Sequence, residues 1–551
     1  MPRHSIKRLL VIIISLGFAG GAPLQASAIP VDTNGTPPVF IEAPVANDAT
    51  AVAIRRILTD GTISFSSSVL DYYLQRQFRP VWSSERRLLP TADALKHLIG
   101  AIGGEGLDPD RPAYHRKHID MLLERETDAN PERLAHLDLL LTDAFFALGH
   151  DLHYGVAYGA DLNTSGTYAN VPVDLSLVLA HAAASGEIEA SLLSLAPQYP
   201  EYRRLLAALG FYRRLAAGGG WRTHAADYAE ETNIRERLIV TGDLNASEAA
   251  DTPEAHAELI AAVKRFQQRH GITADGVVGP VTSAKMAIPP EKLIKKIALN
   301  IERWKWFPPR TGGPYIIVNI PGFELKVIRG DEVLLQTRAI VGRRDRETPT
   351  FASKLRYMVF NPYWRVPETI LKEDLIPKVQ ANPHYLTARH IKLFAADDAG
   401  ERRPIDPGTI DWQRWRDDDM QRYVFRMDPG ADNPLGYVKF IFPNDDDIYV
   451  HDTPAHSLFK NSSATYSSGC IRIRKPLELA HYLLSLEDPE ITYKDILVRI
   501  LSGENVWVRL KDAPEIYITY QTVAVGEDGL IRFYNDIYGN DRKLNKFLNN
   551  Y

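Results

Sequence analysis

The chain has 551 residues, of which 45% are hydrophobic and 24% charged, and its formal net charge at neutral pH is −5. This composition is typical of a globular protein, and the length predicts roughly three or four domains. The slightly acidic balance provides no basic footprint for nucleic acid, so we expect no nucleic-acid partner.

The N-terminal stretch MPRHSIKRLLVIIISLGFAGGAPLQASAIP has basic residues at Arg3, Lys7 and Arg8 before an apolar run, and an A-x-A-like sequence at 26–28. This order predicts a secretory signal peptide over residues 1–28 and therefore an exported protein. A membrane anchor is the alternative interpretation, but the apolar run is shorter than the roughly 18 residues that a spanning helix requires.

Residues 29–64 are rich in Pro, Thr, Ala and Asn and show no sustained periodicity, which predicts a disordered tether. Residues 65–225 repeat apolar side chains at helical spacing and break at glycines, so we expect a helical scaffold domain there. The scaffold offers no catalytic constellation, because His150, His153 and Tyr154 are better interpreted as packing or surface groups than as ligands.

A compact unit is expected over residues 226–290. Thr252 and Pro253 are suited to begin a helix whose apolar face includes Val263 and Phe266. The unit resembles the peptidoglycan-binding domain of cell-wall hydrolases, a small three-helix module, in the pattern Phe266-Gln267, Gly271, Asp275-Gly276, Gly279-Pro280 and Thr282. The alternative is that these residues only maintain the small fold and that wall binding has been lost.

The hydrophobic pattern changes to a period of two over residues 291–525. Phe323, Leu325 and Val327 alternate with charged neighbours, which predicts a mainly antiparallel β domain. A charged, helical stretch over residues 367–422 interrupts the strands, and we expect it to act as a lid, with a loop of no functional role as the alternative. Residues 526–551 are left as a C-terminal tail. The whole chain is thus predicted to be a multidomain α+β protein.

Cys470 is the only cysteine in the chain, so it has no partner for an internal disulfide. It is either a buried inert thiol or a reactive group. Its setting favours the reactive group, because a Ser467-Ser468-Gly469 turn precedes it and a strand ends at His451. A nearby imidazole can accept the thiol proton and form a reactive ion pair.

The turn before the cysteine predicts an oxyanion site. Gly469 allows a sharp turn that exposes the sulfur and directs the amides of Gly469 and Cys470 to a common point. Ser468 belongs to the same turn. No cluster of His and Cys accompanies the thiol, so we expect neither a metal ion nor another cofactor.

The region resembles the L,D-transpeptidases of bacterial cell walls, whose active site has a His on a strand and, after a loop, Ser-(His or Ser)-Gly-Cys-x-Arg. The matching residues here are His451 and the run Ser467 to Arg472. The resemblance covers nearly all of the chain after the signal. It is greatest to the large, lid-bearing periplasmic branch of Gram-negative bacteria, through NPYWRVP (361–367), HDTP (451–454) and VWVRLKDAPEIYITYQ (506–521).

This resemblance implies an enzyme that cross-links peptidoglycan. Cys470 would attack the amide between meso-diaminopimelate and the terminal D-Ala of a donor tetrapeptide stem, with His451 as the proton acceptor. D-Ala would leave, and the amine of a second diaminopimelate would resolve the thioester. The expected location is the periplasm, and carbapenems are expected to acylate the cysteine.

The resemblance also implies roles for neighbouring residues. The backbone carbonyl of Asp452 would orient the imidazole, while Tyr449 and Arg472 would line or brace the substrate site. Trp364 is expected to line a groove under the lid and bind substrate, with a place in the core as the alternative. Peptidoglycan tetrapeptide stems are the expected partners, and other cell-wall synthesis enzymes are further candidates.

Two departures from the family pattern leave alternatives open. Many members have His where Ser468 stands, and lid-bearing members often have Arg where Ala464 stands, which puts one contact to the substrate or loop in doubt. The alternatives are the same thioester chemistry with water, a D-amino acid or a lipoprotein lysine as acceptor, and a non-catalytic peptidoglycan-binding scaffold.

Overall fold

The computed structural model describes residues 48–60, 65–85, 87–124, 130–159, 171–245, 252–308, 312–396 and 402–550. The predicted signal peptide and the first part of the predicted tether lie outside these residues. The chain divides into two compact units, the first of which comprises Met1–Gly103, Asp108–His153 and Val173–Pro197, and the second the remainder.

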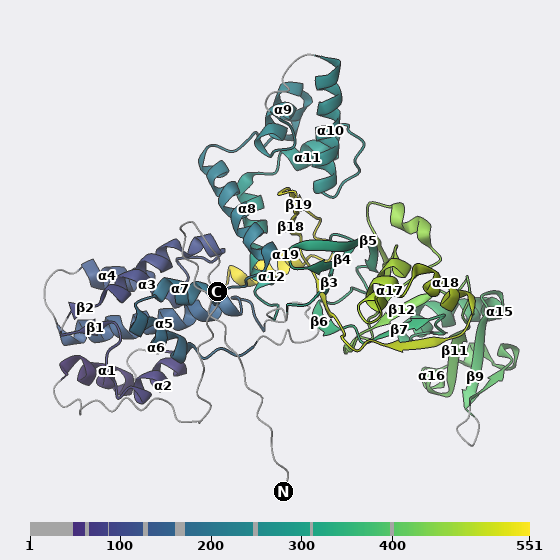
Figure 1. The fold of residues 1–551 in the computed structure, drawn as a ribbon, viewed down its shortest axis with the longest axis horizontal. Coiled ribbons are helices and arrows are strands. Elements are labelled where there is room, and N and C mark those ends of the chain that lie inside the picture. The colour runs from purple at the N-terminus through teal and green to yellow at the C-terminus, as the bar shows by residue number, and fades with distance from the viewer. Residues whose placement is uncertain are drawn as a thin grey trace, which may run out of the picture. The chain divides into compact units, whose positions relative to one another are not determined.

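The first unit is a helical domain, drawn in purple and blue in Figure 1. The buried carboxylate of Asp138, on the long central helix, accepts hydrogen bonds from Tyr73 Oη at 2.5 Å and from the amides of Val81 at 2.8 Å and Trp82 at 2.9 Å. Burial raises the pKa of Asp138 to about 6. The elements are α1 (Ala49–Asp60), α2 (Ser67–Gln75), β1 (Ser83–Ser84), β2 (Arg87–Leu88), α3 (Pro90–Ala101), α4 (Arg116–Glu124), α5 (Pro131–His153), α6 (Leu175–Ser185) and α7 (Ile188–Leu193).

Helix α1 corrects the predicted tether. Residues 49–60 were expected to be disordered with the rest of 29–64, but they form a helix that packs against α5. The reason is a short apolar stripe, in which Ala53, Ile54 and Ile57 are buried. Small alanines supply much of this stripe, so its helical period is weaker than that of a Leu-rich helix.

The second unit begins with α8 (Pro200–Ala217), which packs against α12 (Pro290–Trp304). Between them in the chain lies the module of α9 (Glu231–Val240), α10 (Pro253–Arg269) and α11 (Pro280–Met286) (Figure 1). The side chain of Gln267 fixes its turns, since it donates to Asp275 and Thr282 and accepts from the Gly276 amide at 2.8 Å. The predicted three-helix module is confirmed.

The main sheet is mainly antiparallel, as predicted, and runs in the order β16-β7-β12-β13-β15-β5-β4-β3-β17-β6, with β14 paired to β5. Its alternating apolar residues form a core against α17 and α18. The elements are β3 (Tyr315–Asn319), β4 (Glu324–Arg329), β5 (Glu332–Gly342), β6 (Phe351–Lys354), β7 (Tyr357–Phe360), β12 (Val438–Ile441), β13 (Val450–His451), β14 (Thr465–Ser467), β15 (Ile471–Ile473), α17 (Pro476–Ser485), α18 (Tyr493–Leu501), β16 (Val506–Arg509) and β17 (Glu515–Thr519).

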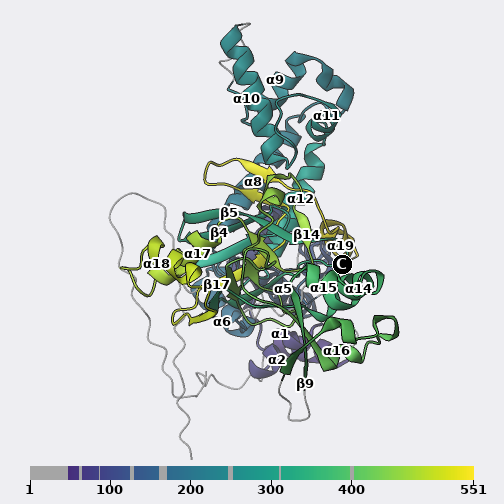
Figure 2. The same cartoon turned by 90° about the vertical axis from the view of Figure 1, so that its right-hand side faces the viewer.

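The insertion, defined here as residues 364–427, is a subdomain of its own rather than the purely helical excursion predicted over 367–422. It contains a sheet in the order β10-β9-β11-β8 and a separate hydrophobic core, and Figure 2 shows α14, α15, α16 and β9 grouped together. The elements are β8 (Trp364–Arg365), α13 (Glu368–Ile370), the π-helical turn η5 (Leu371–Leu375), α14 (Ile376–Ala381), α15 (Tyr385–Ala388), β9 (Ile391–Ala396), β10 (Arg402–Ile405), α16 (Asp419–Arg422) and β11 (Tyr423–Met427).

The C-terminal tail expected after residue 525 is folded. The hairpin of β18 (Val523–Val525) and β19 (Ile531–Phe533) is followed by α19 (Asn540–Leu548), which packs against α12. Tyr538 donates to the Gly342 carbonyl, at the end of β5, at 2.5 Å. Across the described residues, no helix is both long enough and apolar enough to cross a membrane.

Candidate active site

The site is built on two neighbouring parallel strands, β13 and β15. Val450 pairs with Ile471 and His451 pairs with Arg472. Both Val450 and Ile471 are fully buried in the core of the sheet. Because successive side chains of a strand point to opposite faces, His451 and Arg472 lie together on the other face.

The residues two positions earlier on each strand belong to this same face. Tyr449 accepts a backbone hydrogen bond from Ile471 at 3.0 Å, which places it beside Cys470. The rings of Tyr449 and His451 are 5.5 Å apart. The pairing of the two strands thus brings together the four residues that the sequence singled out at this point.

The imidazole of His451 is held in one tautomer. Its Nδ1 lies 2.5 Å from the backbone carbonyl oxygen of Asp452, as the family resemblance implied. A carbonyl can only accept, so Nδ1 carries the proton and Nε2 keeps its lone pair. Burial, together with the positive charge of Arg472, lowers the pKa of His451 to about 3. The ring is therefore neutral at physiological pH and can act as a base through Nε2.

The thiol of Cys470 is half-buried and donates a long hydrogen bond to the Asp447 carbonyl, with 3.8 Å between sulfur and oxygen. Burial raises the pKa of Cys470 above that of a free thiol. A raised thiol pKa and a lowered imidazole pKa both favour the neutral pair. The two strands thus carry a protonated Cys470 thiol and a neutral His451 imidazole on one face of the sheet, whereas the sequence suggested an ion pair.

The turn before the cysteine needs glycine, since Gly469 has φ of 110°. Its amide donates to Ser467 Oγ at 3.2 Å. This differs from the expectation that the amides of Gly469 and Cys470 converge on one oxyanion, because the first of them is already engaged within the turn. Of these two amides, the Cys470 amide is therefore the candidate hydrogen-bond donor to an oxyanion.

Thr348 fastens the turn to the end of β5. Its hydroxyl donates to the Gly469 carbonyl at 2.6 Å and accepts from the Gly342 amide at 2.8 Å. Gly342 has no room for a side chain, because a Cβ there would lie 2.2 Å from the carbonyl oxygen of Arg346. The position of Cys470 therefore depends on a loop more than a hundred residues earlier in the chain.

Arg346, on the same loop, connects the turn with the insertion. Its Nη1 donates to Ser468 Oγ at 2.9 Å and to Asp374 Oδ2 at 2.6 Å, and its Nη2 donates to Glu373 Oε2 at 2.5 Å. Both carboxylates lie on η5, a π-helical turn, and such turns are often found at functional sites. One guanidinium thus links the inserted subdomain to the residues that precede Cys470.

The carboxylate of Asp452 supports the strand end that carries the imidazole. It accepts from the amides of Tyr437 at 2.9 Å and Thr453 at 2.7 Å. Gly436 lets it approach, because a Cβ there would lie 2.3 Å from Oδ2. Asp452 therefore positions His451 through its backbone carbonyl and braces the neighbouring loop through its side chain.

Lys439 is a member of this site that sequence reasoning missed. It pairs with His451 across β12 and β13, and its Nζ lies 3.6 Å from the centre of the Tyr449 ring. Burial lowers its pKa. The alternation in YVKFIFP indicates that Lys439 faces away from the core, because it stands between the core residues Val438 and Phe440. The sequence does not show that this strand pairs with the strand of His451, so Lys439 could not be assigned to the site.

Two other residues of the sequence analysis lie in hydrophobic clusters. Trp364 packs against the core of the insertion, so its substrate contact stays a prediction. Ala464 is fully buried in the sheet core, where the larger Arg of related proteins would require repacking. Within the described part of the chain, no group of three or more His, Cys, Asp or Glu is arranged to hold a metal ion.

Replacing Thr348 with Val tests the fastening of the turn. The change removes the hydroxyl at nearly constant volume and leaves the Gly342 amide and the Gly469 carbonyl without their partner, at a cost of about 1–3 kcal/mol for each. Calorimetry should show a lower melting temperature for the catalytic transition. Thr387→Val, at an exposed position, is the matched control and should change stability by less than about 0.5 kcal/mol. Equal melting curves for both variants would contradict the assigned role of Thr348.

Replacing Arg346 with Ala should release the insertion from the turn. Hydrogen bonds to charged groups contribute about 1.5–3 kcal/mol, so amide hydrogen exchange in Leu371–Leu375 and in the turn before Cys470 should rise by roughly tenfold or more. The neighbouring exposed Arg344 provides the control, and Arg344→Ala should leave exchange unchanged. If hydrogen exchange in Arg346→Ala rises only in the insertion and not in the turn before Cys470, Arg346 does not link these two segments.

Alkylation of the single cysteine tests the protonation state. Only the thiolate reacts, the thiol pKa is raised, and His451 is neutral above about pH 3. The iodoacetamide rate should therefore climb about tenfold per pH unit from about pH 6 to 8, and mass spectrometry should show no plateau. The unfolded chain should react faster than the folded chain at each of these values. A plateau near neutrality would reveal a preformed ion pair.

Comparison with known proteins agrees with this arrangement. Residues 313–508 match the family model described as "L,D-transpeptidase catalytic domain", residues 67–209 the "Scaffold domain", and residues 234–286 the "Putative peptidoglycan binding domain". A Haemophilus influenzae protein named "Putative L,D-transpeptidase" is 36% identical over 268 residues, which cover 48% of this chain and 52% of that protein. The match thus spans about half the length of this relative.

The first match contains strands β3 to β15, the insertion and every residue of the site described above. Domains of these kinds act on or bind peptidoglycan, which indicates a location in the cell envelope. The chain thus combines stretches that are similar to an L,D-transpeptidase catalytic domain, a scaffold domain and a peptidoglycan-binding domain.

Proposed function

We propose that this protein is a cysteine L,D-transpeptidase that joins two peptidoglycan stems through their meso-diaminopimelate residues. The observation that carries the proposal is the single tautomer of His451, whose protonated Nδ1 faces the Asp452 carbonyl. It leaves Nε2 as a base on the same face of the sheet as Cys470. The matched catalytic domain supports the class of reaction.

The first half-reaction transfers the donor stem to the enzyme. As Sγ of Cys470 bonds to the carbonyl carbon of diaminopimelate, the thiol proton moves to Nε2 of His451. The carbonyl oxygen becomes an oxyanion, for which the Cys470 amide is the candidate donor. The bond to the D-Ala nitrogen then breaks, that nitrogen takes the proton from His451, and a thioester remains.

The second half-reaction uses the side-chain amine of another diaminopimelate. This amine attacks the thioester carbonyl, His451 accepts the amine proton, and the carbon–sulfur bond breaks as the proton returns to sulfur. The products are a new amide bond and a restored thiol. A neutral resting pair suits this sequence, because His451 must accept a proton in both halves.

The charged residues of the site supply candidate contacts to the stem. The Nε of Arg472 is buried and has no hydrogen-bond partner among the described residues, which suits a carboxylate of the substrate. Lys439 adds a second positive charge next to Tyr449. We assign these three side chains to binding the donor stem, and Trp364 of the insertion to its outer wall.

We further infer that the protein works in the periplasm after removal of residues 1–28. The peptidoglycan-binding module would hold it on the polymer it modifies. Other enzymes of cell-wall synthesis are the partners expected to supply its stems.

The decisive experiment incubates the full chain with purified disaccharide tetrapeptide and identifies the products by mass spectrometry. Dimers joined through diaminopimelate should appear with an equal amount of D-Ala. Cys470→Ala and His451→Gln should each reduce dimer formation by at least about 10³-fold, whereas Ser463→Ala, on an exposed part of the same loop, should not. Undiminished cross-linking by Cys470→Ala would refute the mechanism.

The same products separate the alternatives. Tripeptide without dimer would mean that water resolves the thioester, and exchange of D-Ala for an added D-amino acid would mean that a small amine does. A third outcome is a carbapenem adduct on Cys470 with no transfer of the donor stem to a second stem or to a lipoprotein lysine. This outcome would show that the thiol is reactive, but it would refute the cross-linking function. A chain with neither adduct nor product would be a scaffold.

A further inference from the structure

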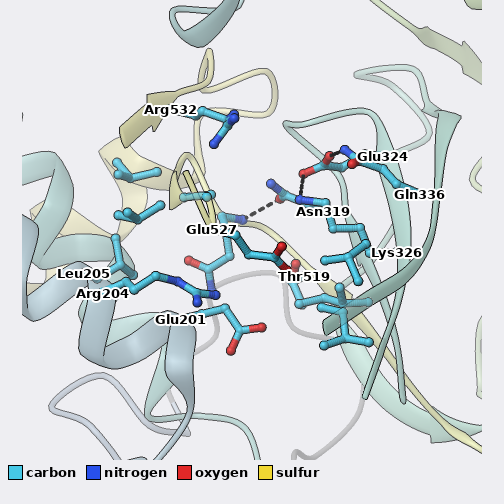
Figure 3. A pocket seen from close by; sticks show the side chains of 18 of the residues that line it. Glu201, Arg204, Leu205, Asn319, Glu324, Lys326, Gln336, Thr519, Glu527 and Arg532 are labelled. Carbon is cyan, nitrogen blue, oxygen red and sulfur yellow. Dashed lines mark hydrogen bonds and ion pairs between the residues drawn. The ribbon is translucent and has the colours of Figure 1, made fainter. Parts of the chain in front are cut away.

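A cavity lies in the unit that contains the candidate active site, and none of the site residues described above lines it. It has a volume of about 340 Å³, within the range of small-ligand sites. Figure 3 shows Glu201 and Arg204 of α8 on one side, Glu324, Lys326 and Gln336 of the sheet on the opposite side, and Arg532 of the β18–β19 hairpin above them. Three separate elements therefore enclose it.

The cavity is remote from the nucleophile. Gln336 lines it from the middle of β5, whereas the catalytic turn is fastened to Gly342 at the end of that strand. Six residues of a strand span about 20 Å. A group bound in the cavity would therefore lie outside the reach of Cys470.

Gln521 is the feature that points to a ligand. It lines the cavity, is 3% exposed, and neither Nε2 nor Oε1 of its side chain has a hydrogen-bond partner among the described residues. Its backbone amide is already fixed by Asn319 Oδ1 at 3.0 Å, so the residue is held in place. A buried amide without partners is unfavourable, and one donor next to one acceptor matches a peptide group.

The charges around the cavity are of both signs. Glu324 pairs with Lys326 at 3.2 Å and accepts from Gln336 at 2.7 Å. Arg204 is different, because its Nε is buried and has no partner among the described residues. Glu527 also lines the cavity and is exposed to solvent. A guanidinium and a carboxylate that are not paired with each other suit a ligand with a carboxylate and an ammonium group.

We propose that this cavity binds part of a peptidoglycan stem peptide as a non-catalytic anchor, which rests on the proposed function. The stem combines secondary amides with carboxylates and the free amine of diaminopimelate. Gln521 pairs with an amide of the stem, Arg204 with a carboxylate, and Glu527 with the amine. The glycan strand also carries amides in its N-acetyl groups, but its repeating disaccharide has no ammonium group for the acidic side chains.

The test uses the full chain with Cys470→Ala, so that the stem is not consumed. Free tetrapeptide should slow hydrogen exchange in the segment 521–533 as well as around the catalytic turn. Adding Gln521→Leu, which replaces the amide by an apolar side chain of similar size, should abolish the first protection and keep the second. Gln75→Leu, at an exposed position of the helical domain, is the matched control and should change neither.

Further variants and ligands complete the experiment. Should Gln521→Leu fail to fold, Arg204→Ala serves in its place, since that residue is only partly buried. Protection of 521–533 by the disaccharide alone, or no protection by the tetrapeptide, would overturn the proposal. Carbapenem acylation of Cys470 in the otherwise unchanged Gln521→Leu chain reports on the active site separately, so the anchor can fail while the proposed function stands.

Discussion

The candidate active site of this protein depends on one hydrogen bond, from Nδ1 of His451 to the backbone carbonyl of Asp452. Because the acceptor is a carbonyl, the bond selects the tautomer whose second nitrogen can receive a proton. A backbone acceptor also has no titration of its own, so the orientation of the ring does not change with pH. The carboxylate of Asp452 can then serve another purpose, the bracing of the loop at residues 436–437.

The other residues of the site are arranged around that fixed ring. Thr348 ties the nucleophile turn to β5, and Arg346 ties the same turn to the inserted subdomain. Cys470, His451 and the insertion come from separate stretches of chain, which the pairing of β13 with β15 and the hydrogen bonds of Arg346 bring together. Preorganisation of this kind reduces the reorganisation needed when charge develops during the reaction.

The sequence predicted those features whose residues lie close together in the chain. The Ser467-Ser468-Gly469-Cys470 turn, the preceding His451 and the three-helix module could all be identified, since each has a compact local pattern. The tether was partly wrong because the apolar stripe of α1 is made largely of alanines, and the insertion was taken as helical because its short strands alternate weakly.

What the sequence could not provide are contacts between distant residues. Lys439 and Arg346 belong to the site only through strand pairing and loop packing, and the cavity around Gln521 needs three elements, the first and last of which are more than three hundred residues apart. The protonation state was also out of reach. A Cys and a His in a motif suggest an ion pair, whereas burial of both groups favours their neutral forms.

The neutral thiol has a consequence for the durability of the protein. Oxidation to sulfenic acid and capping by small disulfides both begin from the thiolate. In an oxidising environment, a lone cysteine that was permanently ionised would be converted to inactive forms, and there is no second cysteine to resolve them. Because burial raises the pKa of Cys470, less of it is thiolate, and the same burial therefore favours its survival in the reduced form.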